Sequence, residues 1–452
     1  MTKTDVVIVG AGVAGLAAAQ RLVAAGLDVT VAEARDRIGG RLWTVHDPSI
    51  SVPIELGAEF VHGTAPEVNR IALDAALGVI DIAGHRSIAT RGRLRQADEF
   101  MARVHRVLSR LDPDRSPDRS LADALARMRS VGSEDRRVAL QYVQGFHAAD
   151  PKIISERSLA EGAKGYAPGD DVRELRIGRV LGGYDGVVRA LASAVTSRIQ
   201  LGSVVTRVRW RTSEVVIDAE SSDGEKLADL QARAVIITIP LGVLSAPPGS
   251  RGRVELDPPL PSKDRAMRML AMGAAVRVSL TLDEPFWISR NFANRRGNGQ
   301  FDTMAFLNAQ SPATFPVWWT PYPVRAPLLV GWCGGPAAWA LSREPREAVI
   351  NAAIRSLATL FGMTQRTMAR RVHAAFTHDW NNDPFSLGSY SYARVGGSRA
   401  STALARPVRG TVYFAGEHAE GRGPNGTVDG AIASGRRAAE LLLRDAHAKR
   451  TA

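Results

Sequence analysis

Residues 5 to 41 read DVVIVGAGVAGLAAAQRLVAAGLDVTVAEARDRIGGR, in the order of a strand, a glycine-rich turn, a helix and a second strand. The apolar run from Asp5 to Val9 ends where Gly10, Gly12 and Gly15 form G-x-G-x-x-G. Gly10 permits the tight turn, Gly12 lets the backbone approach a pyrophosphate, and Gly15 allows close packing of helix on strand. The helix then points its free N–H groups at phosphate. This context predicts a dinucleotide-binding βαβ unit rather than an ordinary glycine-rich turn.

The second strand, Asp28 to Ala32, is followed by Glu33, 18 residues after Gly15. At this distance a carboxylate accepts hydrogen bonds from a ribose diol and repels a 2′-phosphate. Beyond it the stretch continues as E-x-R-x-R-x-G-G-R, which supplies Arg35, Arg37, Gly39, Gly40 and Arg41. Nicotinamide enzymes do not need this extension, whereas flavoproteins that lay an extended FAD across the domain do. The sequence therefore predicts FAD, with contacts from the three glycines and from Glu33, Arg35, Gly40 and Arg41.

These residues resemble the flavin-dependent amine oxidase family, which includes monoamine oxidases, polyamine oxidases and the lysine-specific histone demethylases. The resemblance covers nearly the whole chain; it is strongest at residues 5 to 63 and 376 to 443, and weak between about 85 and 175. It implies an α/β fold, with a Rossmann-like FAD-binding domain and a discontinuous α+β substrate-binding domain. We expect the FAD-binding domain to comprise residues 1–84, 176–258 and 386–452, and the substrate-binding domain residues 85–175 and 259–385.

Hydrophobic periodicity predicts further elements along the chain. Residues 98 to 150 are helix-like. The apolar run ARAVIITIP predicts a buried strand from Ala234 to Ile239 that returns to the first sheet. Beyond a proline-rich connection we expect a helix near Ser262 to Ala271, a strand from Ala275 to Leu282 and a helix from Arg346 to Phe361.

Length and composition limit the class of protein. With 452 residues, 45% hydrophobic and 23% charged, the chain is typical of a soluble globular protein of two domains. It holds no uninterrupted apolar run of about eighteen residues, so we expect no membrane span. Because the first strand begins at Asp5, we expect no signal peptide. Cys333 is the only cysteine, which rules out an internal disulfide and favours a cytoplasmic location.

The net charge is +12, from 58 basic and 46 acidic residues, and nearly all the basic ones are arginine. The arginines are scattered, with no basic run interleaved with aromatics and no zinc spacing. We therefore expect a basic surface rather than a nucleic-acid partner, and no metal site. A positive protein repels a polycationic substrate at long range, so local acids near the active-site mouth would have to reverse that repulsion.

The C-terminal stretch VYFAGEHAEGRGPNGTVDGA predicts a strand, a loop and a helix that begins at Val428, with Thr427 as its N-cap. A helix aimed at the flavin would place free N–H groups where the reduced ring gathers negative charge. Flavin amine oxidases carry a similar G-E-H…G-T-V-x-G-A pattern. This resemblance implies FAD contacts from Gly416, Glu417, Thr427 and Val428, and we add Val205 from the strand pattern at Val204 to Arg209.

ELGAEFVHG, residues 55 to 63, is similar to the L-G-A-x-W-I-H-G of animal spermine and acetylpolyamine oxidases, whose histidine lies at the substrate cavity. In an extended conformation Phe60 and His62 share one face and Glu59 points the other way. His62 is thus the candidate for contacting or deprotonating an amine, because an imidazole titrates near neutrality. A hydrogen-bonded structural histidine is the alternative.

THDWNNDPFSLGSYSY, residues 377 to 392, resembles the stretch that ends beside the flavin with an aromatic residue. The resemblance implies roles for Trp380 and Tyr390. Thr427 stands where members with a full aromatic cage have a second tyrosine, so the cage is half-built. Ser389 occupies the position of the cysteine that attaches the flavin covalently in monoamine oxidases. We therefore expect FAD to be bound non-covalently.

Arg277 departs from the family pattern. Four residues after Gly273 the family normally places a lysine, which holds a water against flavin N5 and assists reoxidation; here that residue is Arg277. Arginine keeps the charge but is larger, planar and harder to deprotonate. The change puts rapid use of oxygen in doubt and leaves open a dehydrogenase with another electron acceptor. A shifted alignment is the alternative explanation.

The resemblance implies an FAD-dependent amine oxidase acting on a polyamine or monoamine. Hydride would pass from the carbon next to nitrogen to flavin N5, the imine would hydrolyse to an aldehyde or ketone, and O2 would become H2O2. The expected partners are a small amine and O2, and the oligomeric state, with a homodimer as one option, stays open. The alternatives are an L-amino-acid oxidase, which needs an arginine to clamp the substrate carboxylate, an amine dehydrogenase, and a flavin-bound scaffold without turnover.

Overall fold

A five-stranded parallel sheet carries the N-terminal fingerprint. The computed structural model describes residues 2–90, 92–97, 99–163, 176–289, 292, 301–421 and 425–451. In spatial order the strands are β11 (Ile199–Gln200), β3 (Val29–Ala32), β2 (Val6–Val9), β15 (Ala234–Ile237) and β24 (Val412–Phe414). Every residue of β2, β3 and β15 is buried, as in a parallel sheet covered on both faces. The strands predicted at 28–32 and 234–239 are confirmed.

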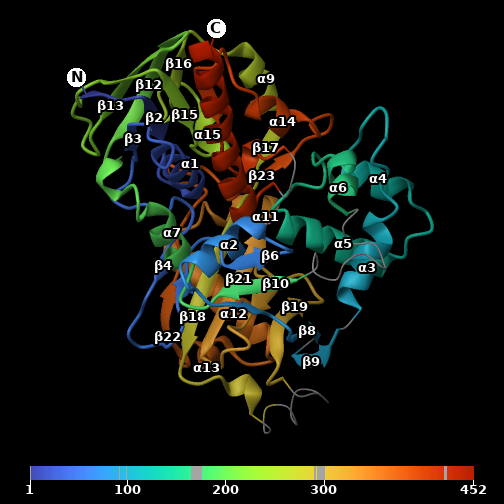
Figure 1. The fold of residues 1–452 in the computed structure, drawn as a ribbon. Coiled ribbons are helices and arrows are strands. Elements are labelled where there is room, and N and C mark those ends of the chain that lie inside the picture. The colour runs from blue at the N-terminus through green and yellow to red at the C-terminus, as the bar shows by residue number, and fades with distance from the viewer. Residues whose placement is uncertain are drawn as a thin grey trace.

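Helices cover one face of this sheet, at the top of Figure 1. They are α1 (Val13–Val23), α7 (Asp185–Ala192) and α15 (Val428–Thr451), and they share one core with β2 and β3. The helices α1 and α15 cross closely, because a Cβ on Gly435 would lie 2.0 Å from the carbonyl oxygen of Ala14. The predicted start of the last helix at Val428 is confirmed.

A second five-stranded sheet packs on the other face of the parallel sheet, around a separate apolar core. Its strands, in spatial order, are β1 (Thr2–Lys3), β14 (Leu230–Ala232), β13 (Glu214–Glu220), β12 (Val204–Arg211) and β16 (Glu255–Asp257). Short helices join this core at its edge, namely α8 (Leu241–Leu244), α9 (Pro261–Arg268) and α14 (Ala400–Ala405).

The helix expected near Ser262 to Ala271 is wrong at its C-terminal end. The helix α9 ends at Arg268, and Leu270–Met272 forms strand β17 instead. This strand pairs antiparallel with β23 (Ser391–Ala393), which follows Tyr390. A long-range strand pairing therefore overrides the local helical pattern, and it attaches the Tyr390 segment to this part of the molecule.

A seven-stranded, mainly antiparallel sheet forms the lower half of Figure 1. In spatial order its strands are β22 (Val372–Phe376), β18 (Ala275–Leu282), β21 (Leu328–Gly334), β20 (Val317–Trp319), β19 (Met304–Ala309), β8 (His85–Thr90) and β9 (Arg93–Gln96). An apolar core joins the sheet to α11 (Pro336–Leu341), α12 (Arg346–Leu360) and α13 (Gln365–Ala369). The predicted strand at Ala275–Leu282 is confirmed, and so is the helix from Arg346, which ends one residue earlier than expected.

Four helices to the right of the view make a separate small core (Figure 1). They are α3 (Phe100–Leu108), α4 (Leu121–Arg127), α5 (Ser133–Phe146) and α6 (Glu156–Ala163). Of the stretch from 98 to 150 that is predicted to be helix-like, the described residues form the helices α3, α4 and α5, joined by turns. Among the described residues no helix combines the length and apolar composition needed to cross a membrane.

Short strands and one further helix connect these layers. β6 (Phe60–His62), β10 (Ile177–Val180) and β7 (Val79–Asp81) form a three-stranded sheet, and β4 (Thr44–Val45) pairs with β5 (Ile54–Glu55). The helix α2 (Pro66–Asp74) follows β6. His62 thus lies on a short strand whose neighbour, β10, comes more than a hundred residues later in the chain.

Candidate active site

One large cavity joins the parallel sheet to the seven-stranded sheet. Its volume is about 1230 Å³, larger than the roughly 300–1,000 Å³ of most small-molecule pockets. Residues of the glycine-rich turn, the N-terminus of α15, β6, β8, β18 and β19 line it together. It therefore has room for a large cofactor and a substrate.

All five residues predicted to act on the substrate line this cavity, namely His62, Arg277, Trp380, Tyr390 and Thr427. So do all but one of the predicted FAD contacts, namely Gly10, Gly12, Glu33, Arg35, Gly40, Arg41, Val205, Gly416, Glu417, Thr427 and Val428. The exception is Gly15, which is not among the lining residues. The structure thus brings together the two ends of the predicted site.

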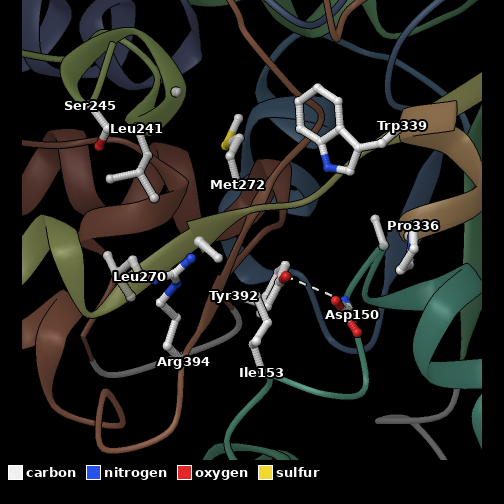
Figure 2. Close-up of a pocket in the computed structure, with 14 residues that line it drawn as sticks. Asp150, Ile153, Leu241, Ser245, Leu270, Met272, Pro336, Trp339, Tyr392 and Arg394 are labelled. Carbon is white, nitrogen blue, oxygen red and sulfur yellow. Dashed lines mark hydrogen bonds between the residues drawn. The ribbon is translucent and has the colours of Figure 1, made fainter. Parts of the chain in front are cut away.

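A second, smaller cavity of about 430 Å³ lies between the loop that follows α5 and the elements α8, β17 and α11 (Figure 2). Trp339 and Arg394 line it, and Tyr392 accepts a hydrogen bond from the backbone N–H of Asp150 at 3.3 Å. No residue predicted to bind FAD or substrate borders this cavity.

The glycine-rich turn leaves space at the N-terminus of α1. A Cβ built on Gly12 would meet no atom within 4 Å, and the neighbouring Val13 and Ala14 also line the cavity. No side chain caps this end of α1, so its first N–H groups remain available to an anion. A Cβ on Gly15 would instead lie 1.9 Å from the carbonyl oxygen of Gly10. The turn therefore fits a pyrophosphate at Gly12, while Gly15 serves helix packing.

The second glycine pair closes the same turn. Gly39 forms a parallel β-bridge with Gly12, and a Cβ on Gly40 would lie 3.4 Å from the Cα of Gly12. Gly39 and Gly40 both have positive φ, at 97° and 60°, which glycine adopts without strain. The G-G-R motif thus lies directly against the phosphate turn.

Glu33 is buried at the end of β3, with 4% of its surface exposed. One carboxylate oxygen accepts the N–H of Ala11 at 2.6 Å and the other accepts the N–H of Arg35 at 2.9 Å. Burial raises the pKa of Glu33, and these backbone hydrogen bonds partly oppose the rise. Each oxygen keeps a further lone pair, so the carboxylate can still accept bonds from a ribose diol.

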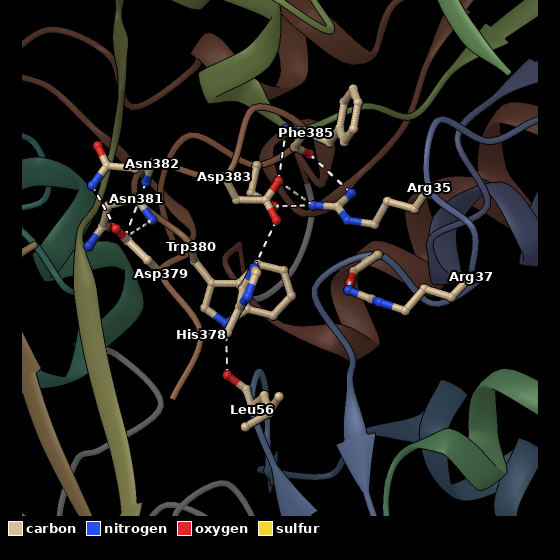
Figure 3. A network of polar contacts seen from close by, with 12 residues as sticks. Arg35, Arg37, Leu56, His378, Asp379, Trp380, Asn381, Asn382, Asp383 and Phe385 are labelled. Atoms are coloured by element: carbon tan, nitrogen blue, oxygen red, sulfur yellow. Dashed lines mark hydrogen bonds and ion pairs between the residues drawn. The ribbon is translucent and has the colours of Figure 1, made fainter. Parts of the chain in front are cut away.

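Arg35 ties the FAD side of the cavity to the segment that carries Trp380 (Figure 3). Its guanidinium donates to Asp383 at 2.7 Å and to the hydroxyl of Ser386 at 3.0 Å, and His378 lies 2.8 Å from the other oxygen of Asp383. Burial opposes ionisation of Asp383, but His378 and Arg35 hold its pKa at about 2. Arg35 therefore positions this segment as well as lining the cavity.

Glu417 holds the C-terminal motif in place through its hydrogen bonds. This carboxylate accepts hydrogen bonds from Arg41 at 2.9 Å, from the N–H of Ser391 at 3.1 Å and from the Ser391 hydroxyl at 2.7 Å. The hydroxyl of Thr427 accepts the N–H of Gly430 at 3.0 Å, which confirms the N-cap of α15. Arg41, Glu417 and the start of α15 are thereby held on one wall of the cavity.

Trp380 and Tyr390 have their polar atoms fixed by the backbone. The Trp380 indole donates to the carbonyl of Leu56 at 2.7 Å, and the Tyr390 hydroxyl donates to the carbonyl of Phe146 at 2.7 Å (Trp380 in Figure 3). Burial raises the pKa of Tyr390. A Cβ on Gly426 would lie 3.2 Å from the Tyr390 ring, so this aromatic lies beside the Thr427 segment. The placement fits the predicted half-built cage.

His62 lies among aromatic rings. Its ring centroid is 5.2 Å from that of Phe146 and 5.9 Å from that of Phe60. Burial lowers the pKa of His62 to about 4, so the imidazole is neutral at pH 7. Within the described part of the chain its ring nitrogens form no hydrogen bond, so the alternative of a hydrogen-bonded structural histidine finds no partner there. A neutral imidazole in the cavity can accept a hydrogen bond from an amine.

Arg277 is buried and paired. Its guanidinium contacts Glu59 at 2.5 Å and donates to the carbonyl of Gly57 at 3.0 Å. Glu59 also pairs with Arg179 at 2.7 Å and accepts the indole N–H of Trp319 at 2.9 Å. Burial opposes ionisation of Glu59, but the charges of Arg277 and Arg179 hold its pKa below the usual range. The arginine thus occupies the cavity wall as half of an ion pair.

Comparison with known proteins decides the family. The family model described as "Flavin containing amine oxidoreductase" matches residues 13–81 and 73–443. The chain belongs to this family. It is 28% identical over 466 residues to "Polyamine oxidase 3" of Oryza sativa subsp. japonica, covering 96% of this chain and 88% of that protein. The prediction of a flavin-dependent amine oxidoreductase is confirmed.

Solved structures confirm the amine oxidase architecture. Putrescine oxidase bound to putrescine matches with a TM-score of 0.78 and 22% identity, covering 98% of this chain and 99% of that one. Cyclohexylamine oxidase from Brevibacterium oxydans IH-35A matches with a TM-score of 0.77 and 21% identity. At these identities the likeness concerns the fold, and the predicted α/β class with its two parts is correct.

The prediction of non-covalent FAD in this flavin-containing amine oxidoreductase is also confirmed. The chain's single cysteine, Cys333, is buried in β21 and does not line the large cavity. At the position before Tyr390, the Ser389 hydroxyl donates to the carbonyl of Gly273. Gly12, Glu33 and the start of α15 would hold FAD, which would supply the electron acceptor for amine oxidation.

The sequence did not reveal several residues of this oxidoreductase cavity. Glu59 is separated from Arg277 by 218 residues, so no local pattern pairs them. Arg86, Asn308 and His147 also line the cavity, and burial lowers the pKa of His147 to about 4. They come from segments where the resemblance is thin or absent, and only their meeting in space marks them.

Proposed function

We propose that the protein oxidises the carbon next to the nitrogen of a small amine. The observation that carries this proposal is one cavity that joins the phosphate turn and Glu33 to neutral His62 and the aromatic residues Trp380 and Tyr390. The glycine-rich turn, Glu33 and the start of α15 would hold FAD, which would supply a two-electron acceptor for the C–H bond next to nitrogen. The amine would become an imine that hydrolyses to an aldehyde or ketone. The protein's own task is then to hold a neutral amine against the flavin.

The cavity wall supports that task. An ammonium ion has no lone pair to push hydride out, and an apolar cavity disfavours it by desolvation. His62, neutral and ringed by Phe60 and Phe146, would accept a hydrogen bond from the amine and orient its lone pair. Trp380 and Tyr390, fixed by hydrogen bonds to the backbone, would keep the substrate carbon in line.

The second part of the proposal concerns the electron acceptor that reoxidises the reduced flavin. Oxygen, reduced to H2O2, is the acceptor that the family implies. Arg277 favours a second candidate, an amine dehydrogenase, because it is bound to Glu59 and Gly57. A guanidinium held in that way is less suited than a free lysine to position a water and to exchange a proton.

The domain assignment and location also stay proposals. The seven-stranded sheet draws its strands from residues 85–96 and 275–376, and the parallel sheet from residues 6–32, 199–200, 234–237 and 412–414. This pattern supports an FAD-binding part of 1–84, 176–258 and 386–452 and a substrate-binding part of 85–175 and 259–385. A cytoplasmic location rests on the single cysteine alone.

An anaerobic reduction experiment tests this function. The purified holoprotein is mixed without oxygen with putrescine, spermidine, benzylamine and cyclohexylamine in turn, and the visible flavin absorbance is followed. Bleaching by at least one of these amines is the expected result, and a flavin that stays oxidised with all of them would overturn the proposal. Admission of oxygen, and separately of a quinone, then measures which acceptor restores the absorbance faster.

A further inference from the structure

Arg86 lies at the end of the cavity away from the phosphate turn. It is on β8, in register with Phe306 on the parallel neighbour β19. Its guanidinium carbon lies 4.5 Å from the centroid of the Phe306 ring and 4.6 Å from that of Phe100, so the group is held between two rings. Both Arg86 and Phe306 line the cavity.

The guanidinium has no carboxylate partner within the described part of the chain. Its one hydrogen bond there goes to the side-chain oxygen of Asn308, at 2.7 Å. Burial lowers the pKa of Arg86 only to about 10, so the group is charged at neutral pH. The Arg86 side chain is half-buried on the cavity wall, and a charge partly removed from water without a counter-ion favours a ligand that supplies the missing charge.

The other arginines of the cavity differ from Arg86 in this respect. Each has a carboxylate within ion-pair distance: Arg35 with Asp383, Arg41 with Glu417, Arg176 with Asp81, and Arg277 with Glu59. Their charges are thus satisfied by the protein itself. Arg86 keeps N–H donors that no described residue accepts, in the fork geometry that binds a carboxylate through two hydrogen bonds.

Among the described residues, the same end of the cavity offers few free carboxylates to a second ammonium group. Glu59 is already shared by Arg277 and Arg179, and Glu161 is exposed on α6. Arg86 would repel a distal ammonium group placed beside it. The charge of the described residues around Arg86 therefore favours an anion over a second ammonium group.

Ring contacts place Arg86 at some distance from His62. Phe60 contacts His62 at 5.9 Å and Phe306 at 5.8 Å between centroids, and Phe306 then contacts Arg86. Successive contacts through two aromatic rings, Phe60 and Phe306, thus link the imidazole to the guanidinium. A ligand that spans the two needs several bonds, or an aromatic spacer, between its nitrogen and its carboxylate.

We propose that the substrate is an amine with a carboxylate at its far end, and that Arg86, held by Asn308, binds this carboxylate. The inference rests on the proposed amine oxidation. The C–H bond next to nitrogen breaks with its electron pair passing to bound FAD, the nitrogen loses a proton, and water converts the imine to an oxo acid and ammonia. The carboxylate takes no part in the bond changes.

Matched substrate pairs test the proposal with the holoprotein. The first pair is 4-(aminomethyl)benzoate and 4-methylbenzylamine, which differ in the distal carboxylate; the second is phenylalanine and 2-phenylethylamine, which differ in an α-carboxylate. The rate of anaerobic flavin reduction, divided by the substrate concentration, should be roughly 10- to 100-fold higher for 4-(aminomethyl)benzoate than for 4-methylbenzylamine. This is the factor expected from one hydrogen bond between charged groups. No such advantage is expected for phenylalanine.

Substitution of Arg86 should remove this preference. Arg86→Met should lose the 10- to 100-fold advantage of the carboxylated amine, and Arg86→Lys should keep part of it. Arg325→Met, at an exposed arginine paired with Asp302, is the matched control and should change neither rate. Because Arg86→Met removes a half-buried charge that has no carboxylate partner among the described residues, its melting temperature should not fall. If Arg86→Met instead melts at a lower temperature and keeps the substrate preference, Arg86 stabilises the fold and does not bind the carboxylate, which would overturn the proposal.

Benzoate gives a readout that does not depend on turnover. It should bind the oxidised holoprotein and perturb the flavin spectrum, and Arg86→Met should weaken that binding by at least tenfold. Equal reduction rates for the first pair would overturn the proposal of a carboxylate site, while amine oxidation would still stand. Faster reduction by phenylalanine than by 2-phenylethylamine would overturn the proposed separation between the amine and the carboxylate. If no amine reduces the flavin, the proposed function fails, and benzoate binding still decides whether Arg86 is an anion site.

Discussion

The two ends of the large cavity satisfy their buried charges in opposite ways. At the cofactor end, formed by Gly12, Glu33, Arg41 and Glu417, the carboxylates accept backbone N–H groups, a serine and one partly exposed arginine. At the substrate end, formed by His62, Arg86, Arg277, Glu59 and Asn308, the buried Glu59 is held by two arginines. A third arginine, Arg86, pairs with no carboxylate among the residues that the structure describes. The first end thus has acceptors for hydroxyl groups, whereas the second has donors for an anion.

Removing one buried carboxylate from each end should give the largest contrast. Glu59→Gln leaves Arg277 and Arg179 buried without a counter-ion, and should lower the free energy of unfolding by about 3–5 kcal/mol. Glu417→Gln should cost less, because 23% of the Arg41 side chain is exposed and water can solvate it. Chemical denaturation of both variants measures the difference. Equal losses would show that the two ends do not differ in how they hold charge.

Of two glycines in the glycine-rich turn, Gly15 is expected to matter for folding and Gly12 for cofactor binding. Gly15→Ala places a methyl group against the Gly10 carbonyl and should cost roughly 1–3 kcal/mol of stability or more. Gly12→Ala meets open space and should leave the melting temperature of the FAD-free protein unchanged. It should nevertheless weaken FAD binding by at least about tenfold, because the methyl group enters the phosphate position. An unstable FAD-free Gly12→Ala variant would contradict this division of roles.

The cofactor end could be predicted because its geometry is local. The glycines, Glu33 and the Thr427 cap lie in two short segments whose spacing alone defines a turn and a helix N-terminus. The substrate end could be predicted only in part. His62, Trp380 and Tyr390 were found by resemblance, whereas Arg86 and Asn308 meet through pairing of β8 with β19, more than two hundred residues apart. Likewise, the Leu270–Met272 strand depends on a distant partner, so local periodicity suggested a helix.

Buried histidines should make the stability depend on pH. Burial lowers the pKa of His62, His147 and His418 from 6.5 to about 4. Between these values the unfolded chain binds more protons, so stability should fall as pH drops from 6.5 to 4 and be unaffected above about 7. Each histidine should contribute on the order of 1–2 kcal/mol by about pH 5.

Single substitutions isolate this effect from opposing groups. Burial raises the pKa of Glu55 to about 7, which makes the folded state gain stability as pH falls through the same window. The comparison is therefore between the wild type and His147→Gln or His418→Gln, measured by denaturation at pH 7 and pH 5. Each variant should lose less stability on acidification than the wild type. An identical loss would mean that the histidine is already protonated or solvated in the folded state.

The smallest expected effect concerns the chemistry at the substrate end. With its pKa lowered to about 4, His62 is a poor base at pH 7 and should act as a hydrogen-bond acceptor that orients the amine. His62→Gln keeps an acceptor, so the anaerobic rate of flavin reduction should fall by about tenfold, within the range of one hydrogen bond. His46→Gln, at an exposed histidine, is the control and should leave the rate unchanged. A loss beyond about 100-fold would instead fit a general base, and would mean that substrate binding returns the imidazole to a normal pKa.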